Sequence, residues 1–477
     1  MTLSSIQIRW RMLALLHGLV AGCASAGPFS ADRIPMPPRP ALLAAPADAP
    51  RPGSNGLQLV AAQTLPTNSP QEQSAGQLPP EATKELSVDA LVEQVLARNP
   101  SLAQMAAAWQ AASARYPQSI ALDDPMFGTS LAPGSVGNAN VNFGWRVEVS
   151  QKLPWPGKRD LRGQAAAAEA NAASHEFEDT RVQLVEAARL AFYEYYLVGR
   201  ALAVNDEALR LLTEFHDNAQ TRYKTGAAPQ QDMLQADVEI GRQRERQLSL
   251  ERMRDVAVAR INTLMNQPTN QSLPPPPADL EAPAGLPERE WLQAAAMANR
   301  PDLQALAARI AADQNALALA QKEYRPDVEV MAAYDGFWQG PQQALAPQIG
   351  LRMNVPLRYS RRNAAVAEAE AKLAGRVAEF EQRRNQVNLQ VEEALAQARE
   401  AERIVKLYTD TILPAAELNV KAAQSAYTTG KTPFISLIEA QRSRVNLRDR
   451  YYEAIADVFR KRASLERAVG GPILQQK

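Results

Sequence analysis

The chain contains the same segment twice, about two hundred residues apart. Tyr-Lys-Thr-Gly-Ala-Ala-Pro at 223–229 recurs as Tyr-Thr-Thr-Gly-Lys-Thr-Pro at 427–433, and the match continues without a gap to Pro268 and Pro472. Each position there pairs with the one 204 residues later (427 less 223). Upstream matches, at slightly different offsets that imply small insertions, are Leu153-Pro154 with Val355-Pro356 and Asn99-Pro100 with Arg300-Pro301. This period is far longer than the roughly 20 to 50 residues of a solenoid unit, which indicates duplication of one whole structural block.

Composition excludes several classes of function. The 477 residues are 46% apolar but only 6% aromatic, which is typical of closely packed helices. Lysine plus arginine equals aspartate plus glutamate at 52 each, so no overall basic field exists to bind nucleic acid. One cysteine and three histidines allow neither an intramolecular disulfide nor a Cys/His metal cage. We therefore expect no metal site, no cofactor and no nucleic-acid partner.

The amino terminus reads as an export signal. Arg9 and Arg11 precede the apolar run 12–21, which ends in Val-Ala-Gly-Cys at 20–23, and this resembles a bacterial lipobox. Residues 1–22 would then be a signal peptide, and Cys23 would carry lipid at the start of a Pro/Ala/Gln-rich segment over 23–86. The alternative is ordinary cleavage after Ala26, which would discard the cysteine. No other segment approaches the length and apolarity of a membrane-spanning helix.

Two long helical tracts, at about 158–221 and 360–427, dominate the remainder, and Pro414 interrupts the second. Each ends at the repeated turn, where glycine permits a left-handed backbone and proline begins a returning helix. Each tract is therefore one arm of a helical hairpin. The predicted first repeat spans 87–280, with a β-hairpin at about 126–152 and a helical hairpin at about 158–266. The second repeat spans 288–472, with a β-hairpin at about 327–357 and a helical hairpin at about 360–469. A tail at 473–477 follows.

The returning helices carry a seven-residue apolar spacing typical of supercoiled helices. In the second repeat this seam consists of Ile438, Val445, Tyr452 and Phe459. The equivalent positions of the first repeat are Leu234, Gly241, Leu248 and Asp255. We therefore expect a thinner seam in the first repeat.

Strand-like alternation precedes each long tract. The apolar positions of the better-defined strands are Val141, Phe143, Trp145, Val147 and Val149 in the first repeat, and Ile349, Leu351, Met353 and Val355 in the second. Alternation alone fits any half-buried sheet, but in an exported chain a strand of about 9 to 11 residues with an aromatic and branched face fits a bilayer. Four strands are too few to close a barrel, so the chain must share strands with copies of itself.

Exported chain, duplicated halves, two β-hairpins and two long helical hairpins together resemble the TolC family of outer-membrane efflux ducts over roughly 87–472. Val-Ser-Gln-Lys-Leu-Pro-Trp-Pro-Gly-Lys-Arg at 149–159 is similar to the strand-to-helix junction of members that serve heavy-metal resistance pumps. The resemblance implies a mainly α fold with a small membrane β part. It also implies a homotrimer whose four strands per chain form a twelve-stranded barrel in the bacterial outer membrane, above a periplasmic α-barrel. Partners would be outer-membrane lipid, a periplasmic adaptor and an inner-membrane pump of the resistance-nodulation-division type.

The tips of the helical hairpins carry the family motif Gly-x-x-x-x-x-Asp-(apolar)-x-x-Ala, which here runs from Gly226 through Asp232 to Ala236. In the second copy Ser436 replaces the aspartate, which puts in doubt a closing network that requires an acid at both tips. We expect these residues at the periplasmic end, where adaptors dock: Arg222, Tyr223, Gly226, Pro229, Asp232, Tyr427, Gly430 and Pro433. The alternative is that they merely form the turns.

Arg146, Glu148 and Arg352 occupy the polar positions of the strands and are expected to face the barrel lumen. Their alternative role is a solvated inner face without selectivity. The resulting hypothesis is a passive exit duct, with heavy-metal cations as the cargo that the junction suggests. An exit duct for polypeptides in type I secretion and a coiled-coil lipoprotein scaffold remain alternatives. An enzyme is not expected, because the sequence contains no phosphate loop, dinucleotide fingerprint or HExxH motif.

Overall fold

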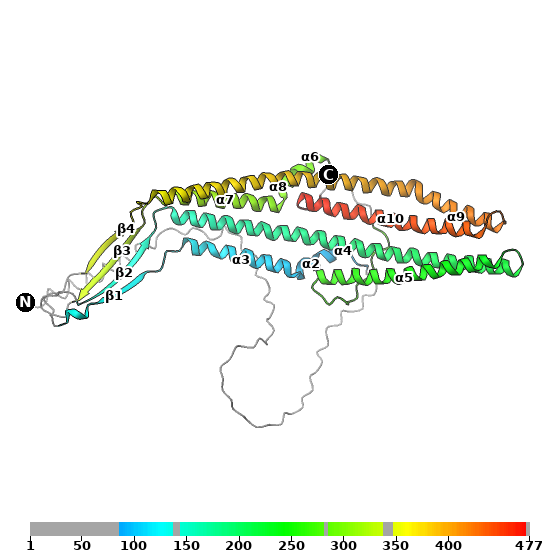
Figure 1. Ribbon diagram of the computed structural model, residues 1–477, viewed down its shortest axis with the longest axis horizontal. Helices are drawn as coiled ribbons and strands as arrows, with labels where there is room; N and C mark the ends of the chain where they lie inside the picture. Colours follow the sequence, from blue (N-terminus) through cyan, green and yellow to red (C-terminus); the bar gives the residue numbers. More distant parts are fainter. Residues whose placement is uncertain (1–84, 137–143, 281–284, 337–346, 474–477) are drawn as a thin grey trace, which may run out of the picture. The chain divides into compact units, whose positions relative to one another are not determined.

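The computed structural model describes residues 85–136, 144–280, 285–336 and 347–473 (Figure 1). Cys23 and the predicted signal lie outside these ranges. Two helices, two strands and two long helical arms follow one another, and this order occurs twice; in the second repeat the first arm is divided into two helices. The first repeat contains α2 Val88–Arg98, α3 Pro100–Ile120, β1 Met126–Leu131, β2 Trp145–Leu153, α4 Lys158–Lys224 and α5 Gln230–Leu264. The second contains α6 Arg289–Asn299, α7 Pro301–Lys322, β3 Val328–Gly336, β4 Gln348–Met353, α8 Tyr359–Leu407, α9 Leu413–Thr428 and α10 Phe434–Val469.

The two β-hairpins join into one antiparallel sheet with the strand order β1-β2-β3-β4 (Figure 1). The junction between the repeats is the β2–β3 pair, whose register runs from Trp145 opposite Gly336 to Leu153 opposite Val328. Successive side chains of a strand point to opposite faces, so this register places the charged residues of both repeats on one face and most of the apolar residues on the other.

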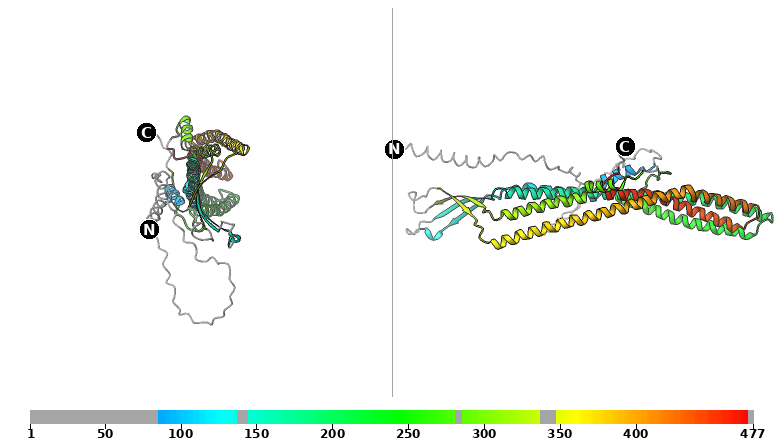
Figure 2. Two further views of the ribbon diagram at one scale, coloured as in Figure 1. Left: turned by 90° about the vertical axis from the view of Figure 1, so that its left-hand side faces the viewer. Right: turned by 90° about the horizontal axis from the view of Figure 1, so that it is seen from above.

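The longest helix, α4, has 67 residues and extends about 100 Å at 1.5 Å per residue. It packs against α3, α5, α7 and α10, so helices of both repeats rest on it (Figures 1 and 2). In each repeat the short first helix seals the base of the returning helix: Leu91 of α2 lies in the cluster with Ile261 of α5, and Leu292 of α6 lies in the cluster with Leu465 of α10. Within the described ranges, no helix combines the length and apolarity needed to cross a membrane.

The apolar seam behaves differently in the two repeats. Ile438, Val445 and Tyr452 are buried, in clusters shared with α4. The first repeat has the thinner seam that was expected, because Leu234 is 51% exposed and Leu248 is 69% exposed. The physical reason is that α5 turns another face toward α4, and its buried positions include Ala236, Glu239, Gln243 and Leu250. The seam positions of α5 therefore point away from the chain's own core.

The second long tract contains the expected irregularity before the tip. A π-helical turn at Tyr408–Ile412 joins α8 to α9, and Pro414 lies in the first turn of α9. A π turn accommodates inserted residues without breaking the helix, and a proline is tolerated where its missing N–H has no partner to lose. This turn fits the insertion implied by the change of offset from 204 at the tips to 202 at the Leu153 and Val355 junctions (355 less 153).

The residue before each repeated proline caps the end of its own returning helix. The Asn99 side-chain amide donates to the Leu264 carbonyl oxygen at 2.9 Å, and the Arg300 guanidinium donates to the Ala468 carbonyl oxygen at 3.2 Å. Leu264 and Ala468 are themselves equivalent under the 204-residue offset. The same helix end is therefore capped by an amide side chain in the first repeat and by a guanidinium in the second.

Arg300 also joins three helices. Its guanidinium makes two hydrogen bonds to the Asp302 carboxylate, at 2.9 and 2.7 Å, and one to Gln390 of α8 at 2.8 Å. Burial opposes ionisation of Asp302, but the hydrogen bonds and charges of Arg300 and Arg383 outweigh it and lower the pKa of this carboxyl from 3.8. The ionised carboxylate therefore contributes stability above the unfolded pKa, and that contribution is lost as the pH falls through the lowered value.

We predict that Arg300→Leu lowers the free energy of unfolding by about 3 kcal/mol at neutral pH, because it leaves a largely buried carboxylate with one partner fewer. Chemical denaturation measures the change. The difference from wild type should shrink as the pH falls below about 4, where Asp302 becomes protonated in the unfolded chain.

Arg289→Leu is the matched control, because Arg289 forms an ion pair with Glu392 at 3.0 Å in which both side chains are about half exposed. Surface pairs of this kind contribute at most about 1 kcal/mol. Equal destabilisation by the two substitutions would contradict the assigned role of Arg300.

Candidate functional site

Both helical hairpins turn with the same backbone geometry. Gly226 and Gly430 adopt φ angles of 70° and 75°, in the left-handed region that favours glycine. The Ala227 and Lys431 amides donate to carbonyl oxygens five residues earlier, at 2.7 and 2.8 Å, as in a helix-ending motif. Pro229 and Pro433 then precede α5 and α10. The glycines and prolines of the predicted tip are thus explained by the turn itself.

Tyr427 links the two hairpins of one chain. It is only 5% exposed, and its hydroxyl donates to the Asp232 carboxylate at 3.1 Å. Its ring packs edge-on against Phe434, with 5.1 Å between centroids. Burial, and then the hydrogen bond and charge of Asp232, raise the pKa of Tyr427 to about 12. The hydroxyl therefore stays protonated and remains a donor at neutral pH.

Arg222 adds a second link between the tips. Its guanidinium donates to the Thr428 carbonyl oxygen at 2.7 Å and lies 5.0 Å from the centre of the Tyr427 ring. We call Arg222, Asp232 and Tyr427 the tip latch. The structure brings these three predicted residues together, whereas the equivalent Tyr223 is 44% exposed.

The duplication makes the composition of the tip latch informative. Under the 204-residue offset, Ala426 is the equivalent of Arg222, and Ser436 is the equivalent of Asp232. The second copy of the latch thus lacks both its cation and its acid.

Charged pairs continue the contact between the hairpins above the tip. Arg442 of α10 donates through Nε to Glu239 of α5 at 2.9 Å, and seven residues further Asp449 of α10 pairs with Arg246 of α5. Burial opposes ionisation of Glu239, but Arg442 and Arg242 lower the pKa of its carboxyl. These residues were not predicted. The sequence does contain a signal for them: α5 and α10 both carry charged residues seven positions apart, and the charges on the two helices are opposite in sign.

The polar face of the sheet carries the three residues that were expected to share a surface. The Arg146 guanidinium makes two hydrogen bonds to the Asp335 carboxylate, at 2.6 and 2.9 Å, and Arg352 pairs with Glu329 at 3.2 Å. Glu148 lies on the same face, in the next alternate position of β2 after Arg146. The partners Asp335 and Glu329 were not predicted as site residues, because alternation assigns a face but no cross-strand register.

The opposite face of the sheet is apolar, yet it is the more open one. Phe127 of β1 is 70% exposed, and Ile349 and Leu351 of β4 are each 75% exposed. Asp335, on the polar face, is instead buried. Within the described part of the chain, β1 and β4 each pair along one edge only. This distribution is the inverse of the one expected for a sheet packed on a protein core.

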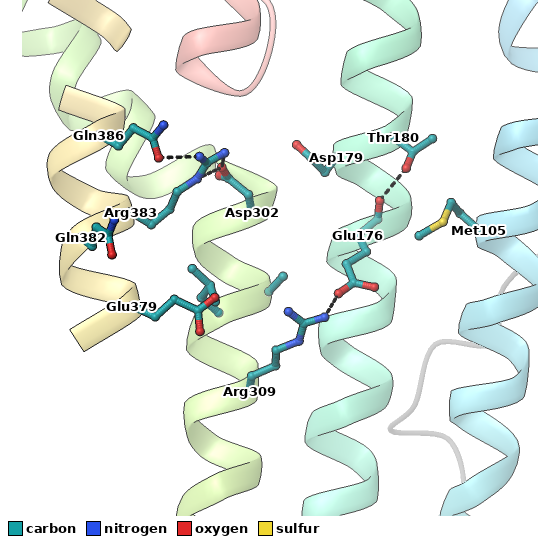
Figure 3. A pocket seen from close by; sticks show the side chains of 12 residues that line it. Met105, Glu176, Asp179, Thr180, Asp302, Arg309, Glu379, Gln382, Arg383 and Gln386 are labelled. Atoms are coloured by element: carbon teal, nitrogen blue, oxygen red, sulfur yellow. Dashed lines mark hydrogen bonds and ion pairs between the residues drawn. The ribbon is translucent and has the colours of Figure 1, made fainter. Parts of the chain in front are cut away.

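A cavity of about 590 Å³ lies between helices of the two repeats (Figure 3). Its lining comes from α3, α4, α7 and α8, and its acids are paired with arginines. The pairs are Glu176 with Arg309, Asp179 with Arg467, Asp302 with Arg383 and Glu379 with Arg376. The first three pairs join different helices, whereas Glu379 and Arg376 both belong to α8, so the cavity is best explained as a joint between the repeats. Among the described residues, no three His, Cys, Asp or Glu side chains gather as a metal site.

Solved structures with a similar fold include outer-membrane channels. The channel OprN superposes with a TM-score of 0.67 at 21% identity, covering 81% of this chain and 90% of that one. CusC gives a TM-score of 0.69 at 17% identity over 81% and 93% of the two chains. VceC from Vibrio cholerae gives 0.67 at 19% identity over 80% and 96%. At these identities the likeness establishes the fold.

A search of curated protein sequences finds no match. The family model of outer membrane efflux proteins matches the chain twice, over residues 91–267 and 292–471. The two matches cover most of the chain and coincide with the two copies of the repeated order of elements. The resemblance noted from the sequence is thereby confirmed, and this chain belongs to the outer membrane efflux protein family.

Proposed function

We propose that three copies of this chain form a passive exit duct of a tripartite efflux system. Their twelve strands would close a barrel in the outer membrane, and their helices would form a tube in the periplasm. An inner-membrane pump of the resistance-nodulation-division type would deliver cargo through a periplasmic adaptor. The observation that carries this proposal is the inverted sheet, with its exposed apolar face and its two half-paired edges. A bilayer covers such a face, and neighbouring copies complete such edges.

Aromatic side chains at both ends of the sheet support the membrane assignment. Trp145 and Tyr334, near the ends of β2 and β3 away from the long helices, lie with their ring centres 5.6 Å apart. Tyr324 and Tyr359 lie where the chain enters and leaves the second hairpin, with their ring centres 6.2 Å apart. Aromatic rings with polar tips favour the two membrane–water interfaces. The nine residues of β3 extend about 30 Å and, when tilted, fit the apolar band between them.

The duplication supports assembly from identical copies. In one chain α10 buries Ile438, Val445 and Tyr452 against α4 of the other repeat. The equivalent face of α5, with Leu234 and Leu248, is exposed in the single chain. A helix from the second repeat of a neighbouring copy would cover it. Exposed apolar residues on α8 and α9 of a neighbouring copy provide that surface: Ile404, Leu407 and Leu418. A closed ring of copies fills every such seam.

Adaptor docking is assigned to the hairpin tips, around Arg222, Tyr223, Asp232 and Tyr427. Lipid on Cys23 would anchor the mature chain to the outer membrane. Heavy-metal cations are the proposed cargo, on the strength of the strand-to-helix junction at 149–159. Specificity would then reside mainly in the pump, since the duct carries its cargo without chemical change.

Purification and conductance test the duct. The purified protein should stay in solution only with detergent. After subtraction of the bound detergent, its mass should equal that of three chains, and it should form ion-conducting pores in planar bilayers. A compact particle with one chain that is soluble without detergent would refute the proposal. Loss of the gene should reduce tolerance to heavy-metal cations. If the deletion leaves cation tolerance unchanged but abolishes secretion of a polypeptide, the cargo is a polypeptide and the heavy-metal proposal is wrong.

We predict that Leu248→Glu converts the trimer into folded monomers, because the substitution places a charge on the open seam of α5. Analytical ultracentrifugation in detergent measures the assembly, and circular dichroism measures the helix content. Val445→Glu is the comparison, since Val445 is buried inside the chain and its replacement should unfold the hairpin as well. A Leu248→Glu protein that remains trimeric would exclude this seam from the interface.

We predict that Tyr427→Phe loosens the tip, because it removes the hydroxyl that donates to Asp232. A loss of about 1 kcal/mol corresponds to roughly fivefold faster amide exchange across 222–232, measured by hydrogen–deuterium exchange. Tyr223→Phe is the matched control at the equivalent exposed position and should leave the rates unchanged. Equal rates in the two variants would show that the hydroxyl of Tyr427 does not stabilise the tip.

We predict that Asp232→Lys lowers the yield of crosslinks between the tip and its adaptor at equal expression. Asp237→Lys, which reverses a half-exposed charge on the same helix, should preserve that yield. If Tyr427→Phe lowers the yield as much as Asp232→Lys, the carboxylate acts by holding the latch. If all three variants crosslink like wild type, the tip assignment is wrong.

A further inference from the structure

The pairing register divides the polar face of the sheet into four layers of side chains. From the loop end toward the helices, the first layer holds Ser130, Arg146 and Asp335, and the second holds Gly128, Glu148, Ala333 and Gln348. The third layer holds Met126, Ser150, Met331 and Gly350, and the fourth holds Lys152, Glu329 and Arg352. Formal charge is distributed unevenly among them.

The first and third layers carry no net charge. Arg146 is neutralised by the bidentate contact with Asp335, and the third layer has no ionisable side chain. The fourth layer holds two cations, Lys152 and Arg352, around the single acid Glu329, whose pairing with Arg352 leaves one positive charge in excess. The second layer holds one ionisable group, Glu148.

Among the described residues, Glu148 has no direct hydrogen-bond or ion-pair partner for its carboxylate, although its charge acts over a distance on Arg146 of the neighbouring layer. The neighbouring amide of Gln348 is turned to Asp335, to which it donates at 3.2 Å. Arg146 is likewise committed to Asp335.

Gly128 makes room for the Glu148 side chain. These residues are directly opposite each other on β1 and β2, and a Cβ atom at Gly128 would lie 2.9 Å from Cγ of Glu148 and 3.1 Å from its Oε1. Any larger residue at 128 would displace the carboxylate. The sheet thus contains a space that fits an otherwise unpaired acid.

We propose that Glu148 determines the charge preference of the duct in its membrane part, an inference that rests on the proposed trimeric duct. Three copies would place three carboxylates in one layer of the lumen, attracting cations and opposing anions. Three excess positive charges would lie in the fourth layer. Four residues of strand separate the two layers, or about 13 Å, which exceeds the Debye length of about 10 Å at 0.1 M salt. A passing ion therefore experiences the two layers one after the other.

Reversal potentials of single pores, measured in a gradient of KCl whose lower concentration is about 0.1 M, test the assignment. Glu148→Gln should lower the ratio of potassium to chloride permeability by about twofold, as expected for three screened charges about 10 Å from the ion path. Lys152→Gln should change the ratio in the opposite direction, and the double variant should lie close to wild type. The effect of each substitution should fade at 1 M salt, where the Debye length is about 3 Å.

The double variant Arg146→Gln with Asp335→Asn is the control, because it removes a neutral pair from the same face and should leave the ratio unchanged. Pores whose permeability ratio is the same with and without the Glu148 carboxylate would overturn the inference while leaving the duct intact. Absence of pores in the wild-type protein would instead refute the proposed function. Gly128→Val provides a second measurement, since displacing the carboxylate without removing it should shift the ratio in the direction of Glu148→Gln.

Discussion

The constraint on which the rest of this structure depends is the need to satisfy backbone hydrogen bonds at the edges of a four-stranded sheet. In a bilayer no water is available to β1 and β4 on their open sides, so their amides and carbonyls must pair with other strands. The exposed apolar face with Phe127, Ile349 and Leu351 likewise needs apolar surroundings that cover its side chains. Both needs are met together when copies of the chain join edge to edge.

The helices also leave surfaces that a single chain does not cover, in this case apolar seams rather than strand edges. One seam, formed by α10 on α4, is filled within the chain by Ile438, Val445 and Tyr452. The equivalent face of α5 is left open with Leu248 exposed. Because the chain is a duplication, each helical contact exists in two versions, and a single chain can close only one of them. Sheet edge and helix seam thus point to the same assembly.

Much of the fold was predictable from local patterns. Alternation identified the polar and apolar faces of the strands, and the glycine and proline spacing identified the hairpin tips. The thinner seam of α5 was also predictable, but its heptad spacing does not reveal which neighbour a helix face meets. Residues such as Asp335 and Glu239 were missed as partners, since ion pairs between distant segments depend on register and on helix rotation. Neither quantity is encoded in the period of a single segment.

The tip latch illustrates what duplication inside one chain makes possible. A ring built from six identical single-repeat chains would have six identical junctions, and every substitution would change all of them. In the proposed trimer the covalent linkage would separate the junctions into two populations, with Tyr427, Asp232 and Arg222 in one, and Tyr223, Ser436 and Ala426 at the equivalent places in the other. Selection could then strengthen three junctions of that assembly and relax the other three independently, which would give a symmetrical tube alternating stiff and compliant seams around its circumference.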